Sequence, residues 1–158
     1  MPLLPALGLT TTPVPDLARF LVGSYELARR ILCTDGTHFD VHGRAEFSAT
    51  GSREILYVER ATLESDHGPV EVSRSHRYRL TTRTTADLYL SDGTFFHRLD
   101  LRVGRSAATH LCGEDRYRGL YVADGADLLV RWHCLGPYKR YISTSRLSRL
   151  SRDEVTDR

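Results

Sequence analysis

Two charged residues fall on faces of predicted strands that are otherwise apolar. Arg29 and Glu59 each share a face with apolar or aromatic neighbours. Those neighbours are Tyr25, Leu27 and Ile31 for Arg29, and Tyr57, Ala61 and Leu63 for Glu59. Because a buried charge is costly unless it is paired, we expect these two residues to pair with each other or with a ligand. Either they form a structural ion pair, or the pair faces a cavity and Glu59 is a candidate general base.

A second set of residues has the chemistry of proton transfer and of anion binding. It comprises His97, His110, Tyr117, Lys139 and Tyr141. Imidazole titrates near neutral pH, and a desolvated Lys or Tyr can exchange protons with a carbonyl or a phenol. A Lys or Arg beside a Tyr can also clamp a carboxylate. The alternative is that the histidines are half-buried with satisfied hydrogen bonds and that the tyrosines only pack the interior.

Within these sets we distinguish catalytic from ligand-binding candidates. The catalytic candidates are Glu59, His97, His110 and Lys139, and the ligand-binding candidates are Arg29, Tyr78, Tyr117, Trp132 and Tyr141. The alternation predicts three inward rows: His97 with Phe95, Leu99 and Leu101, Tyr117 with Asp115 and Tyr121, and Lys139 with Tyr141 and Ser143. The site exists only if these rows converge on one shared interior.

Histidines and cysteines provide little basis for a metal site. His110 and Cys112 point the same way in a strand, whereas the adjacent His133 and Cys134 point in opposite directions. At most three ligands converge, unlike the ligand sets of structural zinc sites, so we expect no metal. Haem would need one axial histidine, and His97 or His110 could serve only by analogy of fold. The sequence contains no phosphate-binding glycine loop, nucleophile elbow or dinucleotide fingerprint, so we expect no cofactor.

The elements that would position these residues are predicted to be short strands joined by tight hairpins. From Ser24 onward apolar and polar residues alternate, and turn signals separate the strands. The turns are Asp35-Gly36, Gly51-Ser52, 66–69, Asp92-Gly93, Asp124-Gly125 and Gly136-Pro137. Residues 104–108 are expected to form a connection, and residues 15–22 a short helix that caps one end.

Nine or ten strands in this order form a meander. Such a sheet leaves no unpaired edge strand if it closes on itself. The predicted fold is therefore all-β: an up-and-down antiparallel β-barrel with a short N-terminal helix and an internal ligand cavity. The alternative is a two-sheet sandwich, whose connections usually need longer loops. We expect one domain over residues 15–150, between a flexible leader over 1–14 and a disordered tail over 151–158.

Length and charge fit one globular domain of 158 residues. The 22 Lys and Arg against 20 Asp and Glu leave a formal net charge of +2, without a basic stripe typical of nucleic-acid binding. Cys33, Cys112 and Cys134 are odd in number and widely spaced, which favours reduced thiols in a cytoplasmic protein. No apolar run approaches the length of a transmembrane helix, and residues 1–14 lack the features of a secretory signal. The expected partner is a small molecule, with neither nucleic acid nor membrane, and a homodimer is left open.

The segment from Phe20 to Tyr25 resembles the Gly-x-Trp start of the calycin superfamily of lipocalins, fatty-acid-binding proteins and nitrobindin-like barrels, with Tyr25 in place of the tryptophan. In those proteins the aromatic residue plugs the closed end of the barrel. Over nearly the whole chain, the pattern also resembles an uncharacterised bacterial family of small barrel proteins with no assigned function. The matching pieces are Arg29, Tyr57-x-Glu59, Asp92-Gly93-x-x-Phe96-His97, His110-x-Cys112-x-x-Asp115-x-Tyr117, Arg131-x-His133 and Gly136-Pro137-x-Lys139-x-Tyr141. The resemblance implies a calycin-like barrel and brings no activity.

Three functions remain open from the sequence. The first is a cofactor-independent isomerase, lyase or cyclase that uses the catalytic candidates for acid–base chemistry inside a closed barrel. The second is a non-catalytic binding or carrier protein for an apolar or carboxylate-bearing small molecule. The third is a barrel filled by its own side chains with its function on the surface, which an interior void of no more than a few waters would favour.

Overall fold

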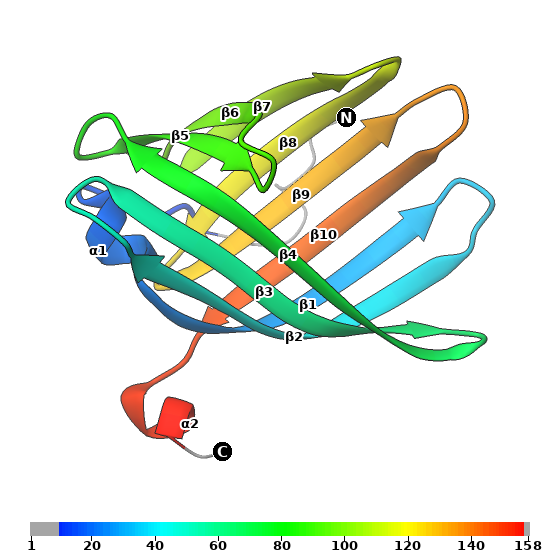
Figure 1. Cartoon of the computed structure of the whole chain (residues 1–158), viewed down its shortest axis with the longest axis horizontal. Helices are drawn as coiled ribbons and strands as arrows, with labels where there is room; N and C mark the ends of the chain where they lie inside the picture. The colour runs from blue at the N-terminus through cyan, green and yellow to red at the C-terminus, as the bar shows by residue number, and fades with distance from the viewer. Residues whose placement is uncertain (1–9, 157–158) are drawn as a thin grey trace.

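Ten antiparallel strands form one continuous sheet that curls into a nearly closed barrel (Figure 1). The computed structural model describes residues 10–156, so residues 1–9 of the predicted leader and 157–158 of the predicted tail lie outside the described part. The strands are β1 (Gly23–Cys33), β2 (His38–Ala49), β3 (Glu54–Ser65), β4 (Gly68–Leu80), β5 (Thr85–Leu90), β6 (Phe95–Asp100), β7 (Arg105–Cys112), β8 (Asp115–Asp124), β9 (Asp127–Leu135) and β10 (Arg140–Arg149). The predicted up-and-down barrel is confirmed.

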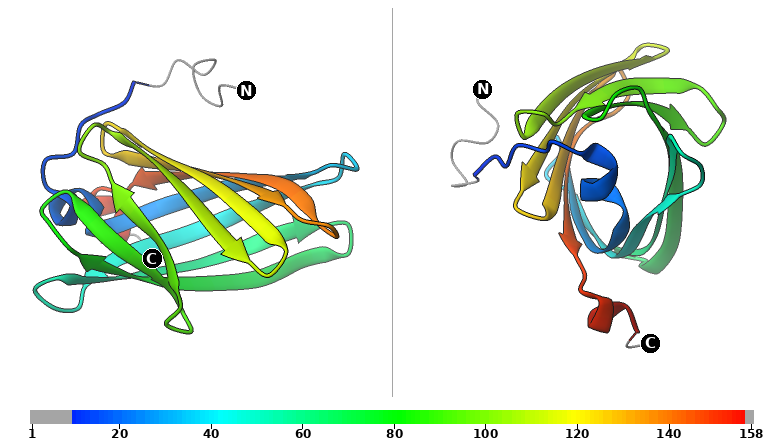
Figure 2. Two further views of the ribbon diagram at one scale, coloured as in Figure 1. Left: turned by 90° about the horizontal axis from the view of Figure 1, so that it is seen from above. Right: turned by 90° about the vertical axis from the view of Figure 1, so that its left-hand side faces the viewer.

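The order of the strands around the barrel is β6-β5-β4-β3-β2-β1-β10-β9-β8-β7. The pairing of β1 with β10 joins the two halves of the meander, and viewed end-on the strands form a ring (Figure 2). Within the described residues, β6 and β7 are consecutive but share no ladder, so a seam separates them. β5 pairs with β4 only from His76 to Leu80, which leaves residues 68–75 of β4 without a strand partner on that side. The barrel wall is therefore incomplete beside residues 68–75 of β4, in the half of the barrel that is farther from the N-terminal helix.

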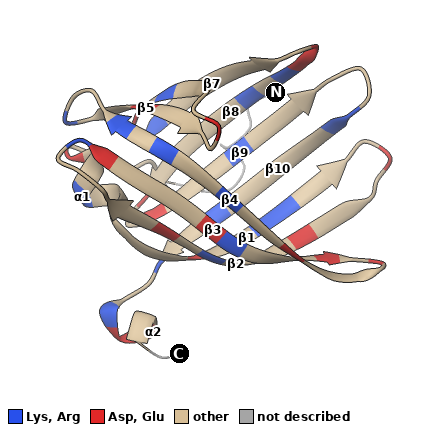
Figure 3. Ribbon diagram, viewed as in Figure 1, with Lys and Arg blue, Asp and Glu red and all other residues tan. Residues whose placement is uncertain are grey.

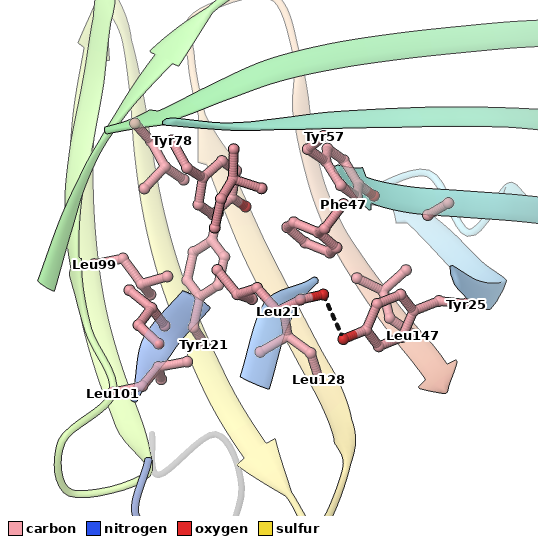
Figure 4. Packing of buried hydrophobic residues seen from close by; sticks show 14 of the residues in the cluster. Leu21, Tyr25, Phe47, Tyr57, Tyr78, Leu99, Leu101, Tyr121, Leu128 and Leu147 are labelled. Atoms are coloured by element: carbon pink, nitrogen blue, oxygen red, sulfur yellow. Dashed lines mark hydrogen bonds between the residues drawn. The ribbon is translucent and has the colours of Figure 1, made fainter. Parts of the chain in front are cut away.

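That helix, α1 (Leu17–Leu21), closes the other end of the barrel. The side chain of Asp16 accepts a hydrogen bond from the backbone N–H of Arg19, so Asp16 is the N-cap and the helix begins one residue later. Leu17 and Leu21 are fully buried. The Tyr25 hydroxyl donates to the carbonyl oxygen of Leu21 at 2.8 Å, amid the buried residues drawn in Figure 4. The helix that the sequence predicted over residues 15–22 is present, and Tyr25 ties it to the first strand.

One predicted inward row is wrong at its first residue. The pairing of β5 with β6 shifts register between Leu88 and Tyr89, so Leu88 faces His97 and Tyr89 faces Phe95. Phe96 is then the extra residue of a β-bulge, which reverses the side to which its neighbour points. Phe95 is 51 % exposed, whereas Phe96 packs against the core. Phe96, rather than Phe95, therefore faces the interior beside His97.

Three segments form hydrogen bonds or elements that the sequence did not predict. Residues 104–108 were expected to connect two strands, but β7 begins at Arg105 because its small residues pair with β8. In the expected leader, the backbone N–H groups of Thr12 and Val14 donate to the barrel, and Val14 is 3 % exposed. In the expected tail, Ser151 and Glu154 bond to each other's backbone N–H groups and start the short helix α2 (Arg152–Thr156).

Charged residues of both signs are mixed along the strands (Figure 3). Exposed pairs such as Arg30–Asp40 and Arg98–Asp87 link neighbouring strands. Within residues 10–156, no helix has the length and apolar character needed to span a membrane.

Candidate functional site

The two inward charges singled out in the sequence form a buried ion pair. Arg29 Nη1 lies 2.7 Å from Glu59 Oε1, and Nη2 lies 2.8 Å from Oε2, so the contact is bidentate. Arg29 Nε donates to Ser145 Oγ at 2.7 Å. Glu59 is 3 % exposed and Arg29 is 9 % exposed. The strands bring these residues together because β2 lies between β1 and β3 and the inward rows stay in phase.

Further contacts hold Glu59 in its ionised form. The Tyr57 hydroxyl donates to Glu59 Oε2 at 2.5 Å, and Arg74 Nε lies 3.8 Å from Oε1. Burial by itself would raise the pKa of Glu59, but the hydrogen bonds and charge of Arg29 outweigh burial and lower that pKa. Burial, followed by the Glu59 charge, raises the pKa of Tyr57. Glu59 is thus a carboxylate whose oxygens are already engaged, and Tyr57 stays protonated.

Arg74 leaves this cluster with one unbalanced positive charge. Two guanidinium groups, of Arg29 and Arg74, face the single carboxylate of Glu59, and Arg29 alone takes both of its oxygens. The Arg74 side chain is 51 % exposed because it lies on the part of β4 that β5 does not cover. Arg74 therefore extends from the buried cluster to solvent at the incomplete side of the wall.

A small cavity adjoins the charged cluster. Its volume is about 40 Å³, which is enough for one or two waters. Its lining residues are Arg29, Tyr57, Glu59, Arg74, His76, Tyr78, Tyr121, Leu128, Val130, Trp132, Ser143, Ser145 and Leu147. A cavity of this size is what the sequence analysis associated with a barrel filled by its own side chains. A larger molecule would fit only if a side chain moved or if the molecule extended past Arg74 toward solvent.

An aromatic layer lies beside the cavity, and Phe96 is at its centre. The rings of Phe96 and Trp132 are stacked, with centroids 5.0 Å apart and an interplanar angle of 19°. Three imidazole rings meet Phe96 at steep angles, with centroids at 5.4 Å for His76, 4.6 Å for His97 and 4.9 Å for His110. These five rings come from four strands: β4, β6, β7 and β9.

His97 is buried and has hydrogen-bond partners for both ring nitrogens. Nδ1 lies 3.2 Å from the backbone oxygen of Arg98, and Nε2 lies 3.0 Å from the Tyr121 hydroxyl. Because a carbonyl oxygen only accepts, Nδ1 carries the proton and Nε2 accepts from Tyr121. Burial lowers the pKa of His97 to about 4, and burial with the charge of Arg74 lowers the pKa of His76 to about 4. Both imidazoles are neutral at neutral pH.

His110 bridges the seam in the barrel. Its Nδ1 lies 3.1 Å from the backbone oxygen of Phe96, so by the same reasoning Nδ1 donates and Nε2 is the acceptor of the neutral ring. The ring is half-buried and lies 6.2 Å from that of Tyr117. His110 is thus oriented by the backbone of the neighbouring strand.

Lys139 is not on the inward row predicted for it. It precedes β10 in the turn after β9, and its side chain is 53 % exposed. Lys139 Nζ lies 3.3 Å from Asp115 Oδ2 and 5.8 Å from the centre of the Tyr117 ring. Hydrogen bonding to Tyr117 and Asp115 raises the pKa of Lys139. Lys139 belongs to the rim of the barrel, while Glu59 and His97 belong to its interior.

The remaining candidates line different levels of the barrel. Tyr78 is buried in the core and borders the cavity. Tyr141 is half-buried near the rim, where burial and then the neighbouring Tyr117 raise its pKa to about 12. Cys112 is exposed, whereas Cys134 is buried. Among the described residues, no group of three or more His, Cys, Asp or Glu side chains is arranged to hold a metal ion.

Sequence reasoning missed several residues of this site. Arg74 and His76 share a row of β4 with Val72, Tyr78 and Leu80, just as Arg29 shares a row of β1 with apolar residues, so that signal was present. The inward position of Phe96 depends on a bulge, and the contact of Ser145 with Arg29 joins residues 116 apart in the sequence. Neither leaves a local pattern.

Comparisons with known proteins agree with this architecture. The family described as "Family of unknown function (DUF6314)" matches this chain over residues 21–149. The S-type phycobiliprotein lyase CPES from Guillardia theta is 10 % identical, with a TM-score of 0.62, over 89 % of this chain and 94 % of that one. Rv2717c from M. tuberculosis is 14 % identical, with a TM-score of 0.53, over 89 % of this chain and all of that one. No curated protein matches the sequence. At these identities the likeness to solved structures establishes the fold alone, which is the up-and-down β-barrel expected from the sequence.

Proposed function

Because this chain belongs to DUF6314, a family of unknown function, its activity has to be inferred from its own site, and we propose that it binds a small molecule bearing a carboxylate in the open side of the barrel. The observation that carries the proposal is the unbalanced charge of Arg74. Arg29 and Glu59 satisfy each other, while Arg74 is half-exposed and directed at the same cluster. A guanidinium that borders an interior is suited to bind a carboxylate through two parallel hydrogen bonds.

The buried ion pair supports this role because it fixes the positions of the polar side chains next to Arg74. Arg29 is held by Glu59 and Ser145, and Glu59 by Tyr57, so these side chains keep their positions when a ligand arrives. Glu59 also attracts Arg74 from 3.8 Å away. A ligand carboxylate would bind the Arg74 guanidinium on the side that faces away from Glu59. Because Glu59 already holds Arg74 near the cluster, the side chain would need to move little on binding.

Acid–base catalysis by the predicted residues has less support than binding. A general base works best when its pKa lies near the working pH. Glu59 has a lowered pKa and engaged oxygens, His97 has a pKa of about 4 and two hydrogen-bond partners, and Lys139 has a raised pKa at the rim. None of these three is prepared to exchange protons at neutral pH.

One residue keeps an isomerase, lyase or cyclase as the second candidate function. His110 is oriented through Nδ1 by the carbonyl of Phe96, which leaves Nε2 as an acceptor beside Tyr117. An imidazole oriented by a backbone carbonyl is a common form of general base. Turnover that is lost in His110→Gln while ligand binding is retained would replace binding with catalysis as the function.

The cysteines support a proposal about the cellular setting. Cys33, Cys112 and Cys134 are all free thiols. Free thiols, one of them exposed, support our proposal of a reducing, cytoplasmic location. Fractionation of cells that express the tagged protein would test it.

Calorimetric titration with benzoate and with benzamide, its neutral match, tests the binding function. We expect benzoate to bind at least tenfold more tightly than benzamide, because a charge-assisted hydrogen bond contributes about 1.5–3 kcal/mol. Arg74→Gln should abolish the preference. Arg77→Gln, on the same strand but on the outer face, is the matched control and should preserve it. Equal binding of the two compounds, or equal losses in the two variants, would show that Arg74 does not bind a carboxylate.

A further inference from the structure

Phe96 occupies a position that the regular strand pattern would not give it. The bulge in the β5–β6 pairing turns its ring inward, while Phe95 remains 51 % exposed. β-Bulges re-aim side chains and are frequent beside functional sites. The ring of Phe96 therefore lies inside the barrel beside the buried His97, while the ring of Phe95 stays outside.

The surroundings of Phe96 have the form of a slot for one flat ring. Trp132 covers one face, with nearly parallel planes. The imidazoles of His76, His97 and His110 stand around the ring at 60°, 74° and 88° to it. Offset stacking and edge-to-face contact are the arrangements that aromatic rings prefer. A planar ring of another molecule would find the same contacts there.

Trp132 occupies space that a side chain at Gly119 would fill. A Cβ added to Gly119 would lie 2.6 Å from two carbon atoms of the Trp132 ring. Glycine at this position of β8 thus lets the indole lie flat on the neighbouring strand. The opposite face of the indole is thereby turned to the ring of Phe96.

Phe96 itself lies on a strand that has a ladder on one side only. It belongs to the hairpin of β5 and β6, two strands of six residues each. Within the described residues, no ladder joins β6 to β7, and two hydrogen bonds that involve side chains cross the seam instead: His110 Nδ1 to the Phe96 carbonyl, and the Asp100 backbone N–H to Ser106 Oγ. The hairpin can move outward without breaking an inter-strand ladder at that edge.

We propose that the ring of Phe96 occupies the ligand position in the free protein. The ligand is a planar aromatic carboxylate whose ring replaces that of Phe96 against Trp132. This inference rests on the proposed function, to which it adds the class of ligand. Trp132 and His76 border both the slot and the cavity of about 40 Å³ beside Arg74, so the slot and the cavity are adjacent. Displacement of Phe96 would join the two spaces. A ring in the slot could then carry its carboxylate toward Arg74.

The test compares three compounds of similar size: benzoate, cyclohexanecarboxylate and benzamide. Trp132 is the single tryptophan of the chain, so its indole N–H gives one resonance that reports on the slot. We expect benzoate to bind at least tenfold more tightly than either of the others and to shift the Trp132 resonance. Phe96→Ala should strengthen benzoate binding at least fivefold, because the competing ring is gone. Thermal unfolding checks that the variant is folded, and Phe96→Val is the alternative if it is not.

Each outcome separates the two proposals. If cyclohexanecarboxylate binds as tightly as benzoate and both depend on Arg74, the carboxylate site stands and the aromatic slot is wrong. If benzamide matches benzoate while shifting Trp132, the slot stands and the carboxylate site is wrong. If benzoate does not bind, both are wrong. If Phe96→Ala weakens benzoate binding, Phe96 is a wall of the site and the displacement is wrong.

Discussion

His110 Nδ1 donates a hydrogen bond of 3.1 Å to the backbone oxygen of Phe96, across an edge of the barrel where no strand ladder exists. This contact and the hydrogen bond from the Asp100 backbone N–H to Ser106 Oγ fasten the β5–β6 hairpin to β7. A side-chain hydrogen bond contributes about 1 kcal/mol, far less than a ladder of several bonds. The barrel therefore has one wall that is closed weakly, next to its aromatic layer.

Loss of that contact should loosen the hairpin more than the rest of the fold. In His110→Leu we expect the backbone amides of residues 90–98 to exchange with deuterium faster, because local opening no longer breaks the His110 bond. Global stability should fall by about 1 kcal/mol. Hydrogen-exchange mass spectrometry measures both. His42→Leu, an exposed outward position on β2, is the control and should leave exchange in the hairpin unchanged. Uniform acceleration across all strands would contradict a local role.

The interior ion pair should be far more sensitive to substitution than an exterior one. Glu59→Gln leaves the buried Arg29 guanidinium without a counter-charge, and the free energy of unfolding should fall by about 3 kcal/mol or more. Urea denaturation measures the loss. Asp40→Asn removes the partner of Arg30 at the surface, where solvent screens the pair, and should change stability little. Similar losses in the two variants would mean that Arg29 reaches solvent or another anion.

Lowering the pH should destabilise the protein already at pH values above those at which its carboxylates titrate. Burial lowers the pKa of His76 and His97 from 6.5 to about 4. Between those values the unfolded chain binds protons that the folded protein does not, so stability falls as the pH drops from about 6.5 to about 4. The loss is on the order of 3 kcal/mol per histidine. Urea unfolding at several pH values measures it.

The contribution of His97 can be separated from that of Glu59. His97→Gln should make the stability profile flatter between about pH 6.5 and pH 4. Glu59 has a lowered pKa, so its contribution is present above its unfolded value of 4.5 and is lost only as the pH falls further. An unchanged slope in His97→Gln would show that the imidazole is protonated in the folded state.

A methyl group under Trp132 should disturb the aromatic layer. In Gly119→Ala the new Cβ would lie 2.6 Å from the ring, so Trp132 must shift and its stacking on Phe96 must loosen. We expect a loss of about 1–3 kcal/mol, typical of overpacking, and a change in tryptophan fluorescence. Gly51→Ala is the control, because the nearest atom to its Cβ is 4.0 Å away. If Trp132 fluorescence is unchanged in Gly119→Ala, the indole does not depend on this glycine.

The outline of the fold could be read from local patterns in the sequence. Side chains alternate across a strand with a period of two, and Asp-Gly and Gly-Pro pairs mark tight turns. Those two rules are enough to predict a meander that closes on itself. They also place Arg29 and Glu59 on inward rows, and a buried charge requires a partner. The ion pair was therefore predictable as one of two alternatives.

The tertiary structure decided which residues meet and how much space they leave. A bulge of one residue exchanges Phe95 for Phe96 inside the barrel, and Lys139 lies in a turn at the rim. The size of the cavity is the small difference between the volume that the strands enclose and the volume of the side chains they carry, which alternation does not determine. The pKa values of Glu59 and His97 likewise depend on burial and on partners far away in the chain. Local patterns specify the side of the sheet on which a residue lies, but only packing specifies its neighbours and its charge.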